Sequence, residues 1–347
     1  MSTPTNHAAW MPAPKVIPLA ISPAPYTAPG PNQIVIRNHA LGINPIDWVK
    51  QLLGDALLAH VQYPAVLGED IAGTVVAVGE GVTRFKEGDR VLAVAAALLS
   101  NSPAEGGFQE YTVVREWFAV GLPESVTFEA GAALPLAVLT AGTGLFGKEG
   151  LALDLPSIPR RESNGRVVIV AGGASAVGGT AVQLVRAAGY DVVSTASPHN
   201  FELVKKLGAE QVFDYKSEDL AAQLGAAVRG RQLCGCFSLG DGTADIFAEV
   251  ILKHEGPGET SKRITRVEGK HTVSEDSGIE MSFVVNGIAR DNATRPLFEE
   301  FLPKALAEGV FVPHPEPVIV GKGLDKIQDA FAKHREGVSA KKVVVQL

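Results

Sequence analysis

The segment that most restricts the possible folds is an uninterrupted apolar run that leads into a glycine-rich turn. Arg166–Ala171 (RVVIVA) is the kind of strand that a parallel sheet buries on both faces. The residues Ala171–Gly178 (AGGASAVG) then predict a tight turn, and Gly179–Ala188 (GTAVQLVRAA) predicts a helix. A strand, a turn and a helix in this order predict a βαβ unit, with the turn at the carboxyl edge of the sheet, where ligands bind.

Strands and helices continue to alternate after this unit. Asp191–Ala196 (DVVSTA) predicts a second strand, Asn200–Leu207 a short helix and Gln211–Tyr215 a third strand. This β-α-β-α-β order is typical of an α/β protein with a doubly wound parallel sheet.

The residues before about 130 follow another pattern. Gln33–Arg37, Gly73–Val78 and Arg90–Ala95 are short β-rich runs separated by glycine turns. Residues 1–31 contain eight prolines, which favour extended chain over helix. The pattern predicts a compact β-rich domain that ends near residue 130.

The remaining segments complete the expected element order. Glu129–Leu145 and Pro296–Glu308 are predicted as helices, and Met281–Ile288 and Lys341–Leu347 as strands. His254–Asp276 is polar and contains several glycines, so we expect a loop there.

Composition excludes several classes of function. The 347 residues favour two domains, and 46% hydrophobic with 20% charged residues suits a globular protein with a large core. A net charge of -7 without a basic block argues against nucleic acid or an anionic membrane as a partner. The sequence shows no signal peptide and no apolar run of the roughly 18 residues that a membrane span needs. The small number of cysteines, two, suits a reducing compartment. We therefore expect a cytoplasmic location.

The glycine-rich turn has the chemistry of an anion site. The first amides of a helix have no intrahelical partner and, together with the helix dipole, attract phosphate. Gly172, Gly173, Ala174, Ser175 and Ala176 have no bulky side chain that would block a pyrophosphate. Because the turn lies between a buried strand and a helix, it predicts a dinucleotide site.

The end of the second strand distinguishes the two nicotinamide cofactors. An NAD site usually places Asp or Glu there, to bind the ribose hydroxyls. Here the strand ends in Ala196–Asn200 (ASPHN), which has no carboxylate to repel a 2′-phosphate and has serine, histidine and asparagine side chains that can donate to one. We therefore predict NADPH. Lys205 and Tyr215 follow, and Lys205 also fits a surface residue without a ligand.

Four segments outside the turn carry a resemblance to a known family: Asn44–Asp47 (NPID), Gly68–Val75 (GEDIAGTV), Phe85–Val91 (FKEGDRV) and Gly106–Tyr111 (GGFQEY). Together with the turn they resemble the medium-chain dehydrogenase/reductase family. The resemblance implies a GroES-like β-rich catalytic domain, residues 1–130 completed by 297–347. It also implies a Rossmann domain with a doubly wound parallel sheet at residues 131–296.

Many members of that family hold a catalytic zinc, which needs thiolate or imidazole ligands. At the corresponding positions this chain has Asn44 and Glu69, and Cys234 and Cys236 are its only cysteines. We therefore expect no metal. The zinc-free branches of the family reduce conjugated C=C bonds or quinones.

Within those branches, Ser197–Phe201 (SPHNF) and Val212–Tyr215 (VFDY) resemble the trans-acting enoyl reductases of fungal polyketide pathways. This resemblance implies cofactor contacts by Ile46, Asp47, Trp48, Val49, Ala174, Ser175, Ala176, Val177, Ser197, Pro198, His199, Asn200, Tyr215, Ser339 and Ala340. It implies substrate contacts by Thr140, Phe283, Val284, Val285, Asn286 and Gly287.

The resemblance also suggests a mechanism. A hydride passes from NADPH to the β-carbon of an unsaturated thioester, and a proton reaches the α-carbon from Thr140, Lys50 or water. Relatives often have a lysine at the position of Val49, whereas here Lys50 is one residue further on. A shift by one residue points a side chain elsewhere.

Three functions remain open on the sequence. The first is an enoyl reductase that acts on a small-molecule or carrier-bound acyl substrate, with a polyketide synthase as its partner in trans. The second is an NADPH quinone or alkene oxidoreductase acting on small molecules. The third is a non-redox protein that shapes a reactive ligand on the same scaffold. We expect a monomer.

Overall fold

The computed structural model describes residues 4–284 and 292–347, and it divides into two compact units. Unit 1 consists of Met1–Leu136 together with Leu306–Leu347, and unit 2 of Ala137–Ala305. The boundaries expected from the sequence, at 130 and 296, lie six and nine residues before those of the structure, at 136 and 305.

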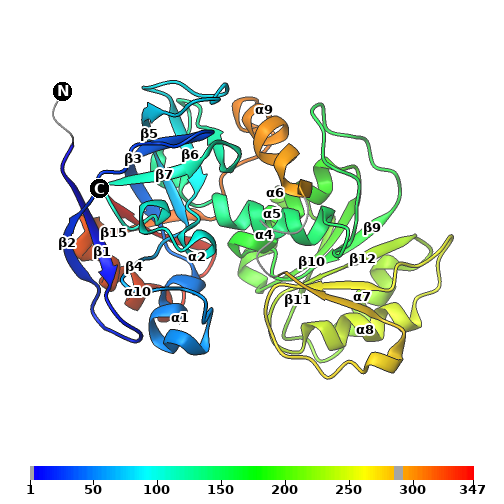
Figure 1. Cartoon of the computed structure of the whole chain (residues 1–347). Helices are drawn as coiled ribbons and strands as arrows, with labels where there is room; N and C mark the ends of the chain where they lie inside the picture. The colour runs from blue at the N-terminus through cyan, green and yellow to red at the C-terminus, as the bar shows by residue number, and fades with distance from the viewer. Residues whose placement is uncertain (1–3, 285–291) are drawn as a thin grey trace. The chain divides into compact units, whose positions relative to one another are not determined.

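Unit 1 is built mainly from strands (Figure 1). Its larger sheet has the order β15-β16-β3-β5-β6-β8, with β7 paired to β3, and a smaller sheet has the order β2-β1-β4. The strands are β1 Asn6–Met11, β2 Ala20–Ala24, β3 Gln33–Gly42, β4 Ala65–Val66, β5 Asp70–Val78, β6 Arg90–Val94, β7 Tyr111–Arg115, β8 Ala119–Gly121, β15 Glu316–Lys322 and β16 Lys341–Gln346. The helices are α1 Pro45–Leu53, α2 Ala97–Ser100, α3 Phe128–Gly131 and α10 Ile327–Arg335.

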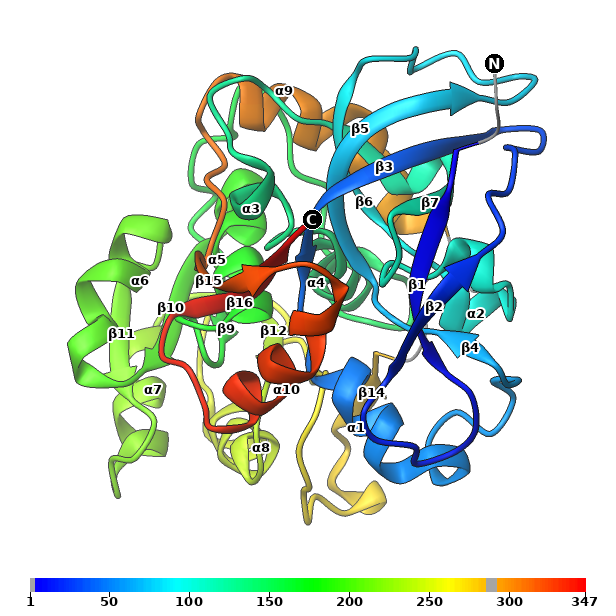
Figure 2. The same ribbon diagram turned by 90° about the vertical axis from the view of Figure 1, so that its left-hand side faces the viewer.

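The C-terminal strand belongs to this β-rich unit. β16 pairs antiparallel with β3, where Val344 lies opposite Gly42, and parallel with β15. Figure 2 shows β15, β16 and α10 side by side. The C-terminal strand therefore shares a sheet with β3 and β5 of the N-terminal part of the chain, as the family resemblance implied.

Unit 2 contains a six-stranded parallel sheet of order β11-β10-β9-β12-β13-β14 (Figure 1). Its strands are β9 Val167–Val170, β10 Asp191–Ala196, β11 Gln211–Asp214, β12 Leu233–Ser238, β13 Arg263–Arg266 and β14 Glu280–Phe283. Its helices are α4 Pro135–Phe146, which starts in unit 1, α5 Ala176–Ala187, α6 Phe201–Leu207, α7 Leu220–Val228, α8 Thr243–Lys253 and α9 Leu302–Ala307, which ends in unit 1.

The apolar run of β9 is explained by burial on both faces of this sheet. All four residues of the strand are buried, and Val167 and Ile169 belong to a core shared with Leu224 of α7 and Phe247 of α8. Because successive strand side chains point to opposite faces, Val168 and Val170 fill the other side. The structure confirms the predicted class, a GroES-like β domain with a doubly wound Rossmann-like sheet.

One expectation about elements was wrong, and two predicted helices differ from the prediction in detail. His254–Asp276 is not a loop throughout, because it contains β13. The helix expected at 129–145 is divided into α3 and α4, and Pro135 at the start of α4 has no amide to continue the first helix. The helix expected at 296–308 begins as a π-helix, Leu297–Phe301, before α9. Of the strand expected at 281–288, residues 281–283 belong to β14, and residues 285–288 lie outside the described residues.

One helical segment among the described residues, Phe128–Phe146, is long and apolar enough to cross a membrane. Two thirds of its most apolar stretch is buried inside the protein, as in the core helix of a soluble protein.

Candidate cofactor and active site

The glycine-rich turn connects β9 to α5 at the carboxyl edge of the parallel sheet. Ser175 is the N-cap of α5, and its Oγ accepts a hydrogen bond of 3.0 Å from the amide of Gly178. The amides of Ala176 and Val177 lie in the first turn, where a helix offers no carbonyl partner. The small residues therefore leave a helix N-terminus available to an anion.

Backbone conformation explains one glycine of this turn, and close packing explains two others. Gly172 has a φ of +61°, which favours glycine. A Cβ on Gly173 would lie 2.4 Å from Ser194 Oγ, and one on Gly178 would lie 2.1 Å from the carbonyl oxygen of Gly172. The turn thus packs directly on β10 and on the start of α5, and this arrangement fits a bound pyrophosphate.

The ends of β10 and β11 lie next to this turn, because β9, β10 and β11 are adjacent parallel strands. After β10 the chain continues through Ser197 into the short 3-10 helix Pro198–Asn200, and after β11 comes Tyr215, which is 49% exposed. Lys216 places its ammonium 5.6 Å from the Tyr215 ring centroid. The amine of Lys205 is bonded to Glu202 at 2.9 Å. The residues predicted to bind the adenosine phosphate are thus brought together at one edge of the sheet.

The Asn44–Asp47 motif forms the N-terminus of α1. The Asn44 amide donates to Asp47 Oδ2 at 2.8 Å, as in a capping box. Asp47 is fully buried, whereas Ile46, Trp48 and Val49 are partly exposed. The other three side chains are therefore accessible on the surface of this helix start, and Asp47 stabilises it through its hydrogen bond to the Asn44 amide.

Lys50 points into unit 1, unlike Val49. Its side chain is fully buried, and its ammonium donates to the carbonyl oxygens of Gly54, Leu57 and Leu58 at 2.8–3.1 Å. An ammonium has three protons, and all three are used by this loop. Burial lowers the pKa of Lys50, while Asp55 at 4.0 Å raises it. The geometry therefore indicates that Lys50 stabilises the loop after α1. It leaves Lys50 no proton to donate to a substrate, against the role predicted for it as a proton donor.

A second buried ammonium, which no sequence pattern predicted, lies next to the N-terminus of α1. Lys342 of β16 donates to Asp70 Oδ2 at 2.6 Å and to Asn44 Oδ1 at 2.7 Å. Asn44 Nδ2 donates in turn to Asp70 Oδ2 at 2.9 Å, and the amide of Leu136 donates to Asp70 Oδ1 at 2.6 Å. Lys342 is only 4% exposed, and Asp70 is fully buried. The pair joins the C-terminal strand to the two motifs at Asn44–Asp47 and Gly68–Val75.

The carboxyl groups around this ammonium have altered acidity. Burial, with Asp70 nearby, raises the pKa of Asp47 to about 7. Burial and the neighbouring Asp47 and Asp70 raise the pKa of Glu69 well above its usual range, and Lys342 only partly opposes this. Within residues 4–284 and 292–347, no group of three His, Cys, Asp or Glu side chains is arranged to hold a metal ion.

The other predicted residues lie in several elements. Thr140 is a partly exposed residue of α4, and Phe283, half exposed, ends β14 just before Val284. Ser339 and Ala340 precede β16, and Ala340 has a φ of +49°. The predicted substrate residues Val285, Asn286 and Gly287 lie outside the described residues.

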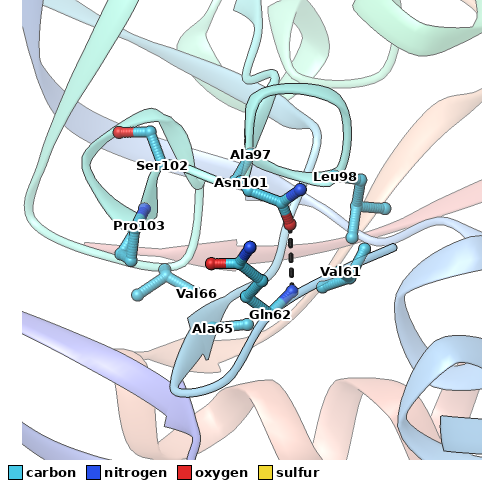
Figure 3. A pocket seen from close by; sticks show the side chains of 9 residues that line it. All are labelled: Val61, Gln62, Ala65, Val66, Ala97, Leu98, Asn101, Ser102 and Pro103. Carbon is cyan, nitrogen blue, oxygen red and sulfur yellow. Dashed lines mark hydrogen bonds between the residues drawn. The ribbon is translucent and has the colours of Figure 1, made fainter. Parts of the chain in front are cut away.

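Unit 1 also contains a small pocket between residues 61–66 and 97–103 (Figure 3). Its lining combines aliphatic side chains with Gln62, Asn101 and Ser102, and Asn101 Oδ1 accepts from the Gln62 amide at 3.0 Å. The enclosed space has room for roughly one water molecule. In this conformation it is too small for an acyl chain.

A β-rich unit joined to a dinucleotide-binding parallel sheet defines a class of nicotinamide-dependent oxidoreductases. Residues 30–124 match the alcohol dehydrogenase GroES-like domain. The chain is 42% identical over 368 residues to dehydrogenase pigH of Monascus ruber, covering 99% of this chain and all of that protein. It is 34% identical over 358 residues to trans-enoyl reductase himH of Aspergillus japonicus, covering 100% of this chain and 99% of that one.

The solved structures agree on the fold. An alcohol dehydrogenase superfamily protein from Novosphingobium aromaticivorans superimposes with a TM-score of 0.77 at 24% identity, over 99% of this chain and all of that chain. The protein therefore belongs to the medium-chain dehydrogenase/reductase family and is an oxidoreductase related to fungal dehydrogenases and trans-enoyl reductases of secondary metabolism.

Proposed function

We propose that the protein is an NADPH-dependent trans-enoyl reductase that reduces a conjugated C=C bond of a polyketide-type acyl thioester without zinc. The observation that carries the proposal is the Lys342 ammonium bonded to Asn44 and Asp70. Asn44 stands at a position where zinc-containing members have a metal ligand, and here it accepts a hydrogen bond from a cation. A fixed positive charge there opposes a second cation, so the residues do not fit a zinc ion.

Because these residues do not fit a Lewis-acid metal, they favour a substrate that is already activated by conjugation. An α,β-unsaturated thioester is such a substrate, since the negative charge left by hydride addition spreads onto the thioester oxygen. Two relatives named trans-enoyl reductases, himH at 34% and tndF of Aspergillus flavipes at 36% identity, support this choice.

The choice of NADPH rests on the end of β10. Ser197 follows the strand directly, where NAD-binding proteins have a carboxylate, and Tyr215 lies at the end of the adjacent strand. Serine and tyrosine hydroxyls are neutral donors that suit a 2′-phosphate. Ala174–Val177 would hold the pyrophosphate at the start of α5.

The chain's own contribution to the reaction is to bind NADPH and the acyl thioester, to position them, and to supply the proton. When bound, NADPH supplies the hydride that the β-carbon accepts. Ile46, Trp48 and Val49 form the partly exposed side of the α1 N-terminus, and Ser339 and Ala340 precede β16; we propose that both border the cofactor. Thr140, Phe283 and Val284 are proposed to border the acyl group, with the Thr140 hydroxyl near the thioester. Val285, Asn286 and Gly287 are proposed to complete that surface.

The test is a panel of acceptors assayed with NADPH and with NADH. We expect NADPH oxidation with enoyl thioesters on a pantetheine or carrier protein, by a cytoplasmic monomer that serves a polyketide synthase in trans. Oxidation with simple quinones or alkenes alone would instead identify a small-molecule reductase. Tight NADPH binding without oxidation by any acceptor would identify a non-redox protein.

A further inference from the structure

One edge of the larger sheet in unit 1 is the strand β15. Among the described residues this strand pairs with β16 alone, so the amides and carbonyls of its outer side have no strand to bond. Such an edge is a template for a further strand, and proteins usually shield it. β15 is shielded mainly near its ends, by Pro317, which has no amide, and by the exposed charges of Glu316 and Lys322.

An open groove of about 350 Å³ lies between β15 and α10, which are side by side in Figure 2. The strand contributes Val318, Ile319 and Val320 to its lining, and one face of the helix contributes Asp329, Ala332, Lys333 and Glu336. Ile319 is 49% exposed, which is unusual for so large an apolar side chain. A groove between an edge strand and a helix fits an extended peptide, which pairs with the strand backbone and directs alternate side chains into the groove.

The charges on the helix side of the groove are already compensated. Lys326 donates to Asp329 at 3.3 Å, and Lys333 donates to Glu336 at 3.3 Å. The groove therefore combines an apolar strand with a helix face that has no excess charge. This lining suits an occupant with uncharged, apolar side chains.

The two ends of β15 differ in their charge partners. Glu316 accepts a hydrogen bond from the ammonium of Lys341 on β16. Lys322 is exposed, and no carboxylate of residues 4–284 and 292–347 lies within ion-pair distance of it. A carboxylate on the occupant, opposite Lys322, would form a cross-strand ion pair there.

A second copy of this chain fits the edge less well than a different chain does. Antiparallel pairing of two β15 strands centred on Ile319 would place Pro317 opposite Gly321 in both halves of the pair. The amide that proline lacks would then be missing twice within one short ladder. A different chain would bring no second proline.

We propose that β15 and α10 form a docking site for an extended segment of another protein, which adds to β15 as a further strand. The segment has uncharged, apolar residues opposite Val318–Val320 and an acidic residue opposite Lys322. Its binding needs neither NADPH nor a substrate, so a failure of this inference is distinct from a failure of the proposed function.

The probe is a fluorescent peptide with blocked ends, Asp-Thr-Val-Val-Val-Thr-Lys. Aligned antiparallel to β15, it places its aspartate opposite Lys322 and its lysine opposite Glu316. The peptide Lys-Thr-Val-Val-Val-Thr-Asp has the same composition with the charges exchanged and is the matched control. The full-length protein should bind the first peptide about threefold or more tightly than the second. Binding should also slow amide hydrogen exchange within residues 316–322.

Substitutions at the exposed side chains test the site from the protein side. Lys322→Glu should reverse the preference between the two peptides. Ile319→Asp should weaken binding of the first peptide about tenfold or more, because the new carboxylate is covered by the bound segment. Val310→Asp is the matched control, at a valine of unit 1 that is 56% exposed and outside the groove, and it should bind like the wild type.

Four results would overturn the inference. They are equal affinity of the wild type for the two peptides, no binding of either, wild-type affinity in Ile319→Asp, and slowed exchange outside β15 but not within it. A dimer of the protein alone by light scattering, with β15 protected from exchange before any peptide is added, would also overturn it, since the occupant would then be a second copy.

Discussion

Replacing Gly178 by alanine tests the phosphate-binding turn directly. The new Cβ would lie 2.1 Å from the carbonyl oxygen of Gly172 and 2.6 Å from its carbonyl carbon, whereas ordinary contacts begin near 3.4 Å. Both atoms are backbone, so the turn and the start of α5 must move apart by about 1 Å. Overpacking of this kind costs about 1–3 kcal/mol, offset by up to ~1 kcal/mol from the better helix propensity of alanine.

The expected result has two parts. The free energy of unfolding in urea should fall by about 1–2 kcal/mol. The Kd for NADPH should rise about tenfold or more, since losing one charge-assisted hydrogen bond costs about 1.5–3 kcal/mol. Gly225→Ala in α7 is the matched control. Its Cβ meets no atom within 4 Å, so it should raise stability by about 0.5–1 kcal/mol and leave NADPH binding unchanged. Wild-type NADPH affinity in Gly178→Ala would refute the proposed geometry of the turn.

Three further predictions follow from the same structure. Lys342→Met should lower the free energy of unfolding by about 3–5 kcal/mol, because it leaves Asp70 buried without its cation. Adding Asp70→Asn to this variant should recover part of the loss. A cost below about 1 kcal/mol for Lys342→Met alone would contradict this reasoning. Asp47 has a pKa of about 7 in the folded protein against 3.8 ordinarily, so the folded state binds its proton more tightly than the unfolded state. The free energy of unfolding of the wild type should therefore fall by up to about 4 kcal/mol as the pH rises from 4 to 7. In urea unfolding, the free energy of unfolding of Asp47→Asn should not show this decrease between pH 4 and 7. An equal dependence on pH in the variant and the wild type would show that Asp47 does not titrate in this range. Ser197→Asp should weaken NADPH binding tenfold or more and leave NADH binding nearly unchanged, as measured by fluorescence titration; an unchanged NADPH Kd would remove Ser197 from the 2′-phosphate site.

The sequence was most informative where local pattern and tertiary context agree. β10 has the predicted bounds, Asp191–Ala196, and β9 followed by the turn and α5 lies where the apolar run and the glycines indicated. These elements carry their own signals, because a doubly buried strand is apolar throughout and a helix N-terminus that approaches phosphate needs small residues.

β13 shows why other elements escaped prediction. Its sequence, Arg-Ile-Thr-Arg, is half charged, yet it lies inside the sheet between β12 and β14. Arg263 pairs with Glu280 at 2.9 Å, and Arg266 donates to the Gly269 carbonyl oxygen at 2.7 Å. The partners that make these charges acceptable come from other segments, which a local pattern does not reveal.

The same limit applies to the candidate site. The sequence indicated that a shift of one residue would turn Lys50 away from the position of Val49, and the structure shows it turned inward. The partners of Lys342 are 272 and 298 residues away, and nothing in the Lys341–Leu347 segment marks one lysine as buried. The raised pKa of Glu69 likewise depends on burial and on charges from three other elements, Asp47 of α1, Asp70 of β5 and Lys342 of β16.

The most direct test of the proposed function follows the hydride itself. The enzyme would be supplied with an α,β-unsaturated thioester and NADPH that carries deuterium at the reacting C4 position, and the product would be analysed by mass spectrometry and NMR. We predict one deuterium at the β-carbon of a saturated thioester and none at the α-carbon, which takes its proton from the protein or water. Recovery of unreduced thioester, with deuterium appearing only in a reduced quinone or in no product, would contradict the account.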